Sequence, residues 1–265
     1  MDKGEFTLGG VSSKTFSIIV TEPPPHVFAE REYENVKVPG RSGDLTIDSG
    51  RYKNTKVPYK CAFVPERGQN LRNLVMSAQT LLGPTAGYRR LENSFVSDRY
   101  YMARIKGDVS VESIVERAGV FTVNFDCDPR AFLLSGENPV TFTGSGTITN
   151  PTAYDAQPLI LVTGTAAGTV SVNGTTVEIK SISGTLYLDC ENENAYALSD
   201  GTPTNKNSTI YAPSFPVLSP GSNGVQFTGG TFFGDNGDGF LRINIGCPRR
   251  YITEGVLRLK KALEG

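Results

Sequence analysis

FPVLSPGSNGVQFT, residues 215–228, joins an apolar run to a Pro- and Gly-rich turn and then to the start of a strand. The stretch is too apolar for a fully solvent-exposed loop and too rich in Pro and Gly for a helix or a continuous strand. We expect Phe215 and Leu218 to be buried and the Pro-Gly pair at 220–221 to turn the chain. Asn223 would cap that turn through its side chain. The stretch is therefore predicted to connect strands of a β-sandwich.

The rest of the C-terminal half supports this prediction. From about residue 135 onward, Thr, Ser, Gly and Asn become frequent and charged residues become rarer. Asn173-Gly174 separates two alternating runs and is a strong hairpin signal. Short strands separated by turn dipeptides predict a β-sandwich of about a hundred residues. The expected strands are 158–164, 169–174, 176–180, 185–190, 225–230 and 240–246.

The N-terminal half is predicted to be mainly β with one helix. Strand patterns occupy residues 11–20, 57–64, 100–107 and 119–128. Residues 66–84 instead place six apolar side chains on one helical stripe, which Gly83 and Pro84 end. We expect this stripe to pack on the sheet as core: Leu71, Leu74, Val75, Ala78, Leu81 and Leu82.

Residues 21–56 form a long segment with little continuous periodicity. Short strand-like pieces at 36–38 and 45–48 flank the turn PGRSGD. Three consecutive prolines, 23–25, favour an extended polyproline stretch that has no donors of its own. A long excursion inside a compact domain is usually functional or bound by a partner. We therefore expect this segment to serve subunit contacts.

Composition excludes several classes of protein. The net charge of −1 and the charged fraction of 20% argue against bulk disorder and against a broad nucleic-acid-binding face. The Arg pairs at 89–90 and 249–250 are isolated and are interpreted as solvated charges. The N-terminus lacks an apolar signal region, and no apolar run is long enough for a membrane span, so we expect synthesis and folding in a cytoplasm. The widely spaced cysteines predict reduced core thiols: Cys61, Cys127, Cys190 and Cys247.

Catalytic motifs are absent from the sequence. The single histidine, His26, lies in the proline-rich loop without a nucleophile elbow or a metal motif. GDNGDG at 234–239 lacks the oxygen ligands of a calcium loop and predicts a tight turn. The acidic stretch 189–196 is predicted to be the solvated end of a loop, with a sugar or cation site as the alternative. No tryptophan offers a sugar platform, and four tyrosines replace it only in part: Tyr154, Tyr187, Tyr196 and Tyr211. We expect no catalytic residue, cofactor or metal.

The order of motifs resembles the distal tail proteins (Dit) of long, non-contractile-tailed phages that infect Gram-positive bacteria. In the N-terminal half, GVSSKTFSIIV and VPGRSGDLTIDSGRYKNT precede a strand and a helix. The C-terminal half contains NPTAYDAQPLILVTG, TVSVNG, LYLDCENENAY, an Asn-rich loop at 205–207, FPVLSPGSNGVQFTGG and CPRRYI. Two features depart from the family pattern, which are Arg250 in place of an aromatic residue and the composition of the loop at 199–214. The resemblance covers nearly the whole chain.

The resemblance implies a structural hub. It implies residues 1–135 as a β-sandwich-type ring domain with one helix, 136–250 as a galectin-like or carbohydrate-binding-module-like β-sandwich, and 251–265 as a tail with a short helical pattern. The ring, usually a hexamer, would join the tail tube to the tail-tip protein or tail-associated lysin at the distal end of the virion's tail, with DNA only in transit and a tape-measure protein as a further partner. The motif residues are Pro39, Gly40, Gly43, Asn150, Pro151, Asp189, Phe215, Pro216, Leu218, Pro220, Gly221, Asn223, Pro248 and Arg249.

Two other functions stay open at this point. The C-terminal sandwich is compatible with a module that binds host cell-wall carbohydrate or another host receptor. Unassigned pairs of carboxylates leave a glycoside hydrolase or cell-wall lysin as a third hypothesis, because glycoside hydrolysis needs only two such groups.

Overall fold

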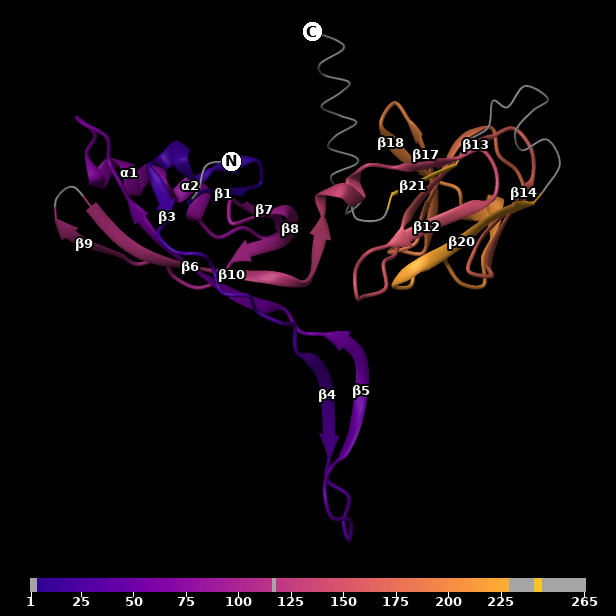
Figure 1. Ribbon diagram of the computed structural model, residues 1–265, viewed down its shortest axis with the longest axis horizontal. Coiled ribbons are helices and arrows are strands. Elements are labelled where there is room, and N and C mark those ends of the chain that lie inside the picture. Colours follow the sequence, from indigo (N-terminus) through magenta and orange to yellow (C-terminus); the bar gives the residue numbers. More distant parts are fainter. Residues whose placement is uncertain (1–3, 116–117, 229–240, 245–265) are drawn as a thin grey trace. The chain divides into compact units, whose positions relative to one another are not determined.

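The computed structural model describes residues 4–115, 118–228 and 241–244, and the chain divides into two compact units, Met1–Phe132 and Leu133–Gly265. Both units are mainly β (Figure 1). The boundary had been expected at residue 135, and the two units divide between Phe132 and Leu133. Each unit has its own cluster of buried apolar side chains, so each is described by itself.

The first unit is built on one curled sheet with the strand order β2-β1-β7-β8-β10-β6-β3, and β9 pairs with β10. Antiparallel pairing joins β1 to β2 and β7, β7 to β8, β6 to β3 and β10, and β9 to β10. The strands are β1 (Phe6–Leu8), β2 (Val11–Ser12), β3 (Ile18–Val20), β6 (Thr55–Phe63), β7 (Arg89–Asn93), β8 (Val96–Ile105), β9 (Val111–Val115) and β10 (Ala118–Leu133).

The core of the first unit lies on one face of this sheet. The alternation expected in 57–64 is confirmed, because Tyr59, Cys61 and Phe63 are buried there. Phe6, Tyr59 and Phe125 meet edge to face, with ring centroids 4.8–5.9 Å apart. Such aromatic contacts stabilise a core beyond the area that they bury.

The expected helical stripe is confirmed as core, but the helix is divided in two. The segments α1 (Leu71–Ser77) and α2 (Gln79–Leu82) meet at Ala78 and lie over the core face of the sheet (Figure 1). Asn70 begins α1 by accepting a hydrogen bond from the backbone N–H of Arg72, 2.9 Å away. The division at Ala78 could not be read from the 3.6-residue period, which continues through it.

The prediction of one strand over 11–20 was wrong in detail. The segment contains β2, the 3₁₀ turn η1 (Ser13–Phe16) and β3. The Ser12 side chain accepts a hydrogen bond from the N–H of Lys14, and Ser17 adopts the left-handed conformation with φ 56°. Ser side chains compete for backbone donors in this way and so favour turns over strands.

The second unit is a sandwich of two sheets around its own core. A six-stranded sheet has the order β11-β21-β13-β16-β17-β18, and a five-stranded sheet has the order β12-β20-β14-β15-β19. The strands are β11 (Val140–Phe142), β12 (Gly146–Asn150), β13 (Leu159–Gly164), β14 (Gly168–Val172), β15 (Thr175–Ile179), β16 (Gly184–Asp189), β17 (Asn194–Ser199), β18 (Thr202–Asn205), β19 (Ile210–Tyr211), β20 (Gly221–Thr228) and β21 (Leu241–Asn244), with short turns η2 (Leu134–Glu137) and η3 (Asn207–Thr209).

The hairpin predicted at Asn173-Gly174 is confirmed. Val172 pairs with Thr175, and both turn residues have positive φ, 50° and 85°. This is the two-residue turn whose twist matches that of the flanking strands.

Candidate subunit-contact surface

An extended segment crosses the core side of the sheet in the first unit. We call residues 23–28 the strap; it has no regular secondary structure and begins with three prolines. Prolines have no N–H, so the first half of the strap offers no donors for pairing with a strand. Its side chains stay exposed at the far end, where Phe28 is 89% accessible. The strap can therefore be recognised through apolar side chains rather than through backbone pairing.

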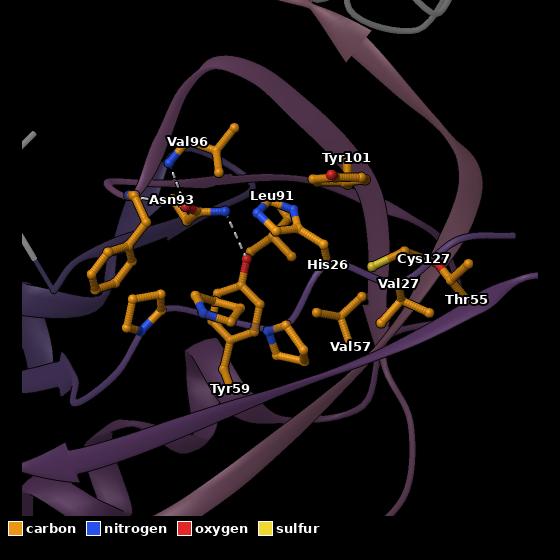
Figure 2. A pocket seen from close by; sticks show the side chains of 14 residues that line it. His26, Val27, Thr55, Val57, Tyr59, Leu91, Asn93, Val96, Tyr101 and Cys127 are labelled. Carbon is orange, nitrogen blue, oxygen red and sulfur yellow. Dashed lines mark hydrogen bonds between the residues drawn. The ribbon is translucent and has the colours of Figure 1, made fainter. Parts of the chain in front are cut away.

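A cavity of about 200 Å³ lies beneath the strap (Figure 2). The strap forms one wall, and core-facing residues of β6, β7, β8 and β10 with the β7–β8 turn form the other. The lining residues are Pro23, Pro24, Pro25, His26, Val27, Thr55, Val57, Tyr59, Leu91, Asn93, Phe95, Val96, Tyr101 and Cys127. His26, the one histidine of the sequence, is therefore a wall residue of this cavity.

The buried polar groups of the cavity satisfy one another. Asn93 Nδ2 donates to the hydroxyl oxygen of Tyr59 at 3.0 Å, and Asn93 Oδ1 accepts from the N–H groups of Phe95 and Val96 at 3.0 and 2.9 Å (Figure 2). Burial raises the pKa of Tyr59, which keeps the phenol neutral. Because these groups already have partners, the cavity favours an apolar side chain over a polar ligand.

The strap leads into a two-stranded hairpin, which we call the arm, formed by β4 (Arg31–Val36) and β5 (Leu45–Tyr52). The arm projects away from the sheet of the first unit (Figure 1). Only short strand-like pieces had been expected here, at 36–38 and 45–48. The longer pairing is supported by ion pairs between the strands and at their base, such as Arg31 with Asp48 at 2.6 Å and Lys53 with Glu30 at 3.0 Å.

The two faces of the arm differ in chemistry. On one face, Thr46 donates to Asn35 at 3.0 Å, and Arg31 lies 5.6 Å from the centre of the Tyr52 ring. The hydrogen bond from Arg31 lowers the pKa of the Asp48 carboxyl, and the backbone N–H of Gly50 adds to this effect. This face is thus mostly polar, and it also carries Tyr33, which is 51% exposed.

The opposite face of the arm carries an uncovered apolar stripe. Val36 pairs with Leu45, and Glu34 pairs with Ile47, so these four side chains share one face. Leu45 and Ile47 are 39% and 47% exposed. We call Val36, Leu45 and Ile47 the arm stripe. The strand-like pieces expected at 36–38 and 45–48 contain these three residues, and the alternation Leu45-Thr46-Ile47 is the signal that marks one apolar face.

The predicted residues Pro39, Gly40 and Gly43 all lie in the loop at the tip of the arm. Gly40 and Gly43 have φ values of 78° and 83°, a conformation that strongly favours glycine. A Cβ at either glycine would meet no atom within 4 Å. Backbone conformation rather than crowding therefore explains glycine at these two positions.

In the second unit, the structure brings most of the predicted motif residues together at the end of the five-stranded sheet. Asn150 Nδ2 donates to the carbonyl oxygens of Tyr154 and Leu218, at 2.8 and 2.9 Å. Pro151 follows directly on the exposed side. Leu218 is buried as expected, and it forms a bridge with Ala156; Phe215 is half-buried against the same core, and Pro216 is buried.

Asn223 holds the turn that precedes β20. Its Nδ2 donates to the carbonyl oxygens of Ser219 and Gly221, each at 2.9 Å, and Asn173 donates to its Oδ1. Pro220 and Gly221 form this turn, with Gly221 at φ 90°. FPVLSPGSNGVQFT therefore contains the hydrogen-bonded connection from β19 to β20 of the five-stranded sheet, together with β20 itself.

Asp189 lies apart from that cluster. It is buried at the end of β16 and accepts hydrogen bonds from the backbone and the side chain of Asn192, at 3.0 and 2.9 Å. It closes the loop before β17 rather than presenting its carboxylate to solvent. Across the part of the chain that the structure describes, no group of three His, Cys, Asp or Glu could hold a metal ion.

Several sequence predictions fall outside the described residues. They are the turn at 234–239, Cys247, Pro248, Arg249, Arg250 and the helical pattern at 251–265. The other three cysteines are free and buried, as predicted. Among the residues that can be described, no helix is long and apolar enough to cross a membrane.

The four tyrosines considered as a sugar platform do not form one surface. Tyr187 and Tyr196 stack on each other on β16 and β17, with centroids 5.0 Å apart, and Tyr196 is 2% exposed. Tyr154 and Tyr211 are exposed, but Tyr211 lies on β19 of the five-stranded sheet, whereas β16 and β17 belong to the six-stranded sheet. A sugar ring would find no pair of exposed stacked aromatics among them.

The architecture has a solved counterpart. The crystal structure of phage SPP1 Dit (gp 19.1) is similar to this chain with a TM-score of 0.68, covering 91% of this chain and 98% of that chain at 14% sequence identity. The chain has the Dit fold. SPP1 Dit is described as a paradigm of the hub adsorption apparatus in phages that infect Gram-positive bacteria.

The Dit fold confirms the resemblance drawn from the motifs, at the level of fold. Chains in two structures of the activated phage p2 baseplate, one with Sr and one with Ca, match at TM-scores of 0.48 and 0.47 with 8% identity. They cover 91% and 92% of this chain and 98% of their own length. No family model and no curated protein matches the sequence.

Proposed function

We propose that the protein is a structural hub at the distal end of a phage tail, where six copies form a ring through the first unit. The ring would join the tail tube to the tail-tip proteins and leave a channel for DNA. The observation that carries the proposal is the arm, a hairpin with an uncovered apolar stripe in a chain with the Dit fold.

A hairpin of this kind needs a partner. An isolated two-stranded hairpin is only marginally stable in water. Leu45 and Ile47 gain nothing from remaining exposed in a single chain, whereas burial in a subunit contact would contribute about 25 cal/mol for each Å² of apolar surface. The six exposed large apolar residues between 27 and 47 concentrate this surface in the strap and the arm: Val27, Phe28, Tyr33, Val38, Leu45 and Ile47.

The distribution of exposed apolar side chains supports assembly through the first unit rather than the second. Ten of the large exposed apolar residues identified in the described chain lie before residue 133, and four lie after it. The near-neutral net charge is compatible with a channel that DNA crosses, because a strongly basic lumen would retain DNA. The proposed location is accordingly the virion, after synthesis and assembly in the bacterial host cytoplasm.

Size measurement tests the proposal. Light scattering coupled to gel filtration, at micromolar concentrations, is expected to give a mass of about six times the 28.6 kDa chain. The same measurement should be repeated with the tail tube protein and with the tail-tip protein encoded by the same phage. A chain that remains monomeric at every concentration, alone and with both proteins, would contradict the proposed function.

A further inference from the structure

We infer that the arm stripe of one copy docks onto the strap of the next copy, with Ile47 or Leu45 entering the cavity beneath Pro23–Val27. This inference rests on the proposed function, because it names the surface that receives the arm. Its partner is a second copy of this chain.

The cavity has the size and chemistry for one apolar side chain. An apolar cavity of about 150 Å³ is large enough to bind a benzene molecule. The cavity beneath the strap is about 200 Å³, and its Tyr59–Asn93 pair already has internal partners. A branched aliphatic side chain such as that of Ile47 or Leu45 therefore fits without leaving a buried polar group unpaired.

The strap extends this receiving surface beyond the cavity. Val27 and Phe28 are 44% and 89% exposed and lie at its rim. Phe28 has the highest accessibility among the large exposed apolar side chains of the described residues. Exposed apolar side chains beside the cavity are suited to contact the apolar arm stripe of another copy rather than a polar ligand.

The reach of the arm makes the contact intermolecular. Lys53 at the base lies six positions after Ile47, which at about 3.3 Å per residue places the stripe roughly 20 Å from its own strap. The arm also points away from the sheet over which that strap lies (Figure 1). One copy therefore carries the apolar stripe and the cavity at separate places, as a head-to-tail contact requires. Head-to-tail contacts form a ring when the rotation between copies closes.

The charges beside the strap are balanced within the chain. Glu22 pairs with Lys60 at 2.8 Å and Glu30 pairs with Lys53 at 3.0 Å. The proposed contact therefore depends on apolar side chains rather than on charge.

Cross-linking between different single-cysteine chains tests the inference. In a Cys247→Ser background, Phe28→Cys and Ile47→Cys chains are mixed, allowed to assemble and treated with a short bifunctional thiol reagent. Cys61, Cys127 and Cys190 are buried, so the introduced thiols are the accessible ones. We expect a 28–47 cross-link in the mixture, and little in either variant alone. Thr46→Cys replaces Ile47→Cys in the matched control, because Thr46 lies on the opposite face of the arm.

A second experiment places a charged side chain in the proposed apolar contact and measures assembly. Phe28→Asp and Ile47→Asp are each expected to raise the concentration needed for half-assembly at least tenfold, whereas Thr46→Asp and Met76→Glu should change it less than threefold. All four side chains are exposed, so circular dichroism should show native folding in every variant.

The outcomes separate the inference from the proposed function. Rings that form without a 28–47 cross-link would overturn the inference and leave the hub proposal standing. Cross-links of 28–28 or 47–47 within single variants would indicate a two-fold contact and would also overturn the inference. A protein that remains monomeric under all conditions would overturn both.

Discussion

The side-chain amide of Asn150 donates a hydrogen bond to the carbonyl oxygen of Leu218, 2.9 Å away and 68 residues later in the chain. Asn150 is 1% exposed, so this contact is shielded from water. The same amide binds the carbonyl oxygen of Tyr154. One side chain therefore joins the end of β12 to the connection that leads into β20.

Replacing Asn150 by Ala should destabilise the second unit. The change removes the two hydrogen bonds that the Asn150 amide donates and the one that its Oδ1 accepts from the N–H of Thr152. Leu218 O keeps the N–H of Ala156 and Tyr154 O keeps the hydroxyl of Thr152, so we expect the ordinary cost of about 0.5–1.5 kcal/mol for each lost bond. Differential scanning calorimetry of the full chain should show one transition moved to lower temperature. The control is Asn138→Ala, an exposed side chain of the same unit, which should leave both transitions in place. Equal shifts in the two variants would contradict the role given to Asn150.

Replacing Tyr59 by Phe should destabilise the first unit. The change removes the acceptor for Asn93 Nδ2 and leaves a buried donor unpaired, at a cost of about 1–3 kcal/mol. Tyr101→Phe in the same cavity provides the comparison, because no hydrogen bond of its hydroxyl contributes to the network described above. Urea unfolding followed by tyrosine fluorescence measures the difference, and an equal effect of both changes would refute this prediction.

The buried cysteines predict a stability that is lost at alkaline pH. Burial raises the pKa of Cys61 and of Cys127 to about 12, above the ordinary value of about 9. A group whose pKa is higher in the folded state contributes stability that is fully present below pH 9 and is lost as pH rises toward 12. Cys61→Ala should flatten this loss, measured as unfolding temperature between pH 8 and pH 11. Mass spectrometry after thiol labelling at pH 8 should find both thiols unmodified until denaturant is added.

The arm is expected to loosen at acidic pH. The pKa of Asp48 is lowered by the hydrogen bond from Arg31, so the ion pair contributes above the ordinary carboxyl pKa of about 4 and is lost as pH falls below it. Amide hydrogen exchange of Arg31–Tyr52 should therefore accelerate at pH 3 relative to pH 6, after correction for intrinsic rates. Asp48→Asn should exchange fast at both pH values. Unchanged protection of the arm at pH 3 would contradict this reading.

Much of the fold could be predicted from local pattern. The faces of β6 and β10, the apolar stripe of the helices and the Asn173-Gly174 hairpin follow from periods of 2.0 and 3.6 and from turn chemistry. The prediction failed in detail where local side-chain and backbone geometry interrupted these periods. Ser12 and Ser17 converted part of an expected strand into a 3₁₀ turn, and the helix was divided at Ala78.

The candidate contact surface could be predicted only in outline. The segment 21–56 was expected to serve subunit contacts, yet its pairing across β4 and β5 depends on ion pairs between residues far apart in sequence, such as Arg31 and Asp48. The cavity combines the strap with residues up to Cys127, which no local pattern could bring together. The Asn150–Leu218 contact also joins residues far apart in sequence, so it could not be predicted from local pattern, although the motifs that contain the two residues had each been identified.

Negative-stain electron microscopy of the purified full-length chain tests the central claim most directly. The hub proposal predicts closed rings with six-fold symmetry and a central channel, which should become rare when Ile47 is replaced by Asp and persist when Thr46 is replaced by Asp. Single particles of one chain, or open filaments without a channel, would contradict it.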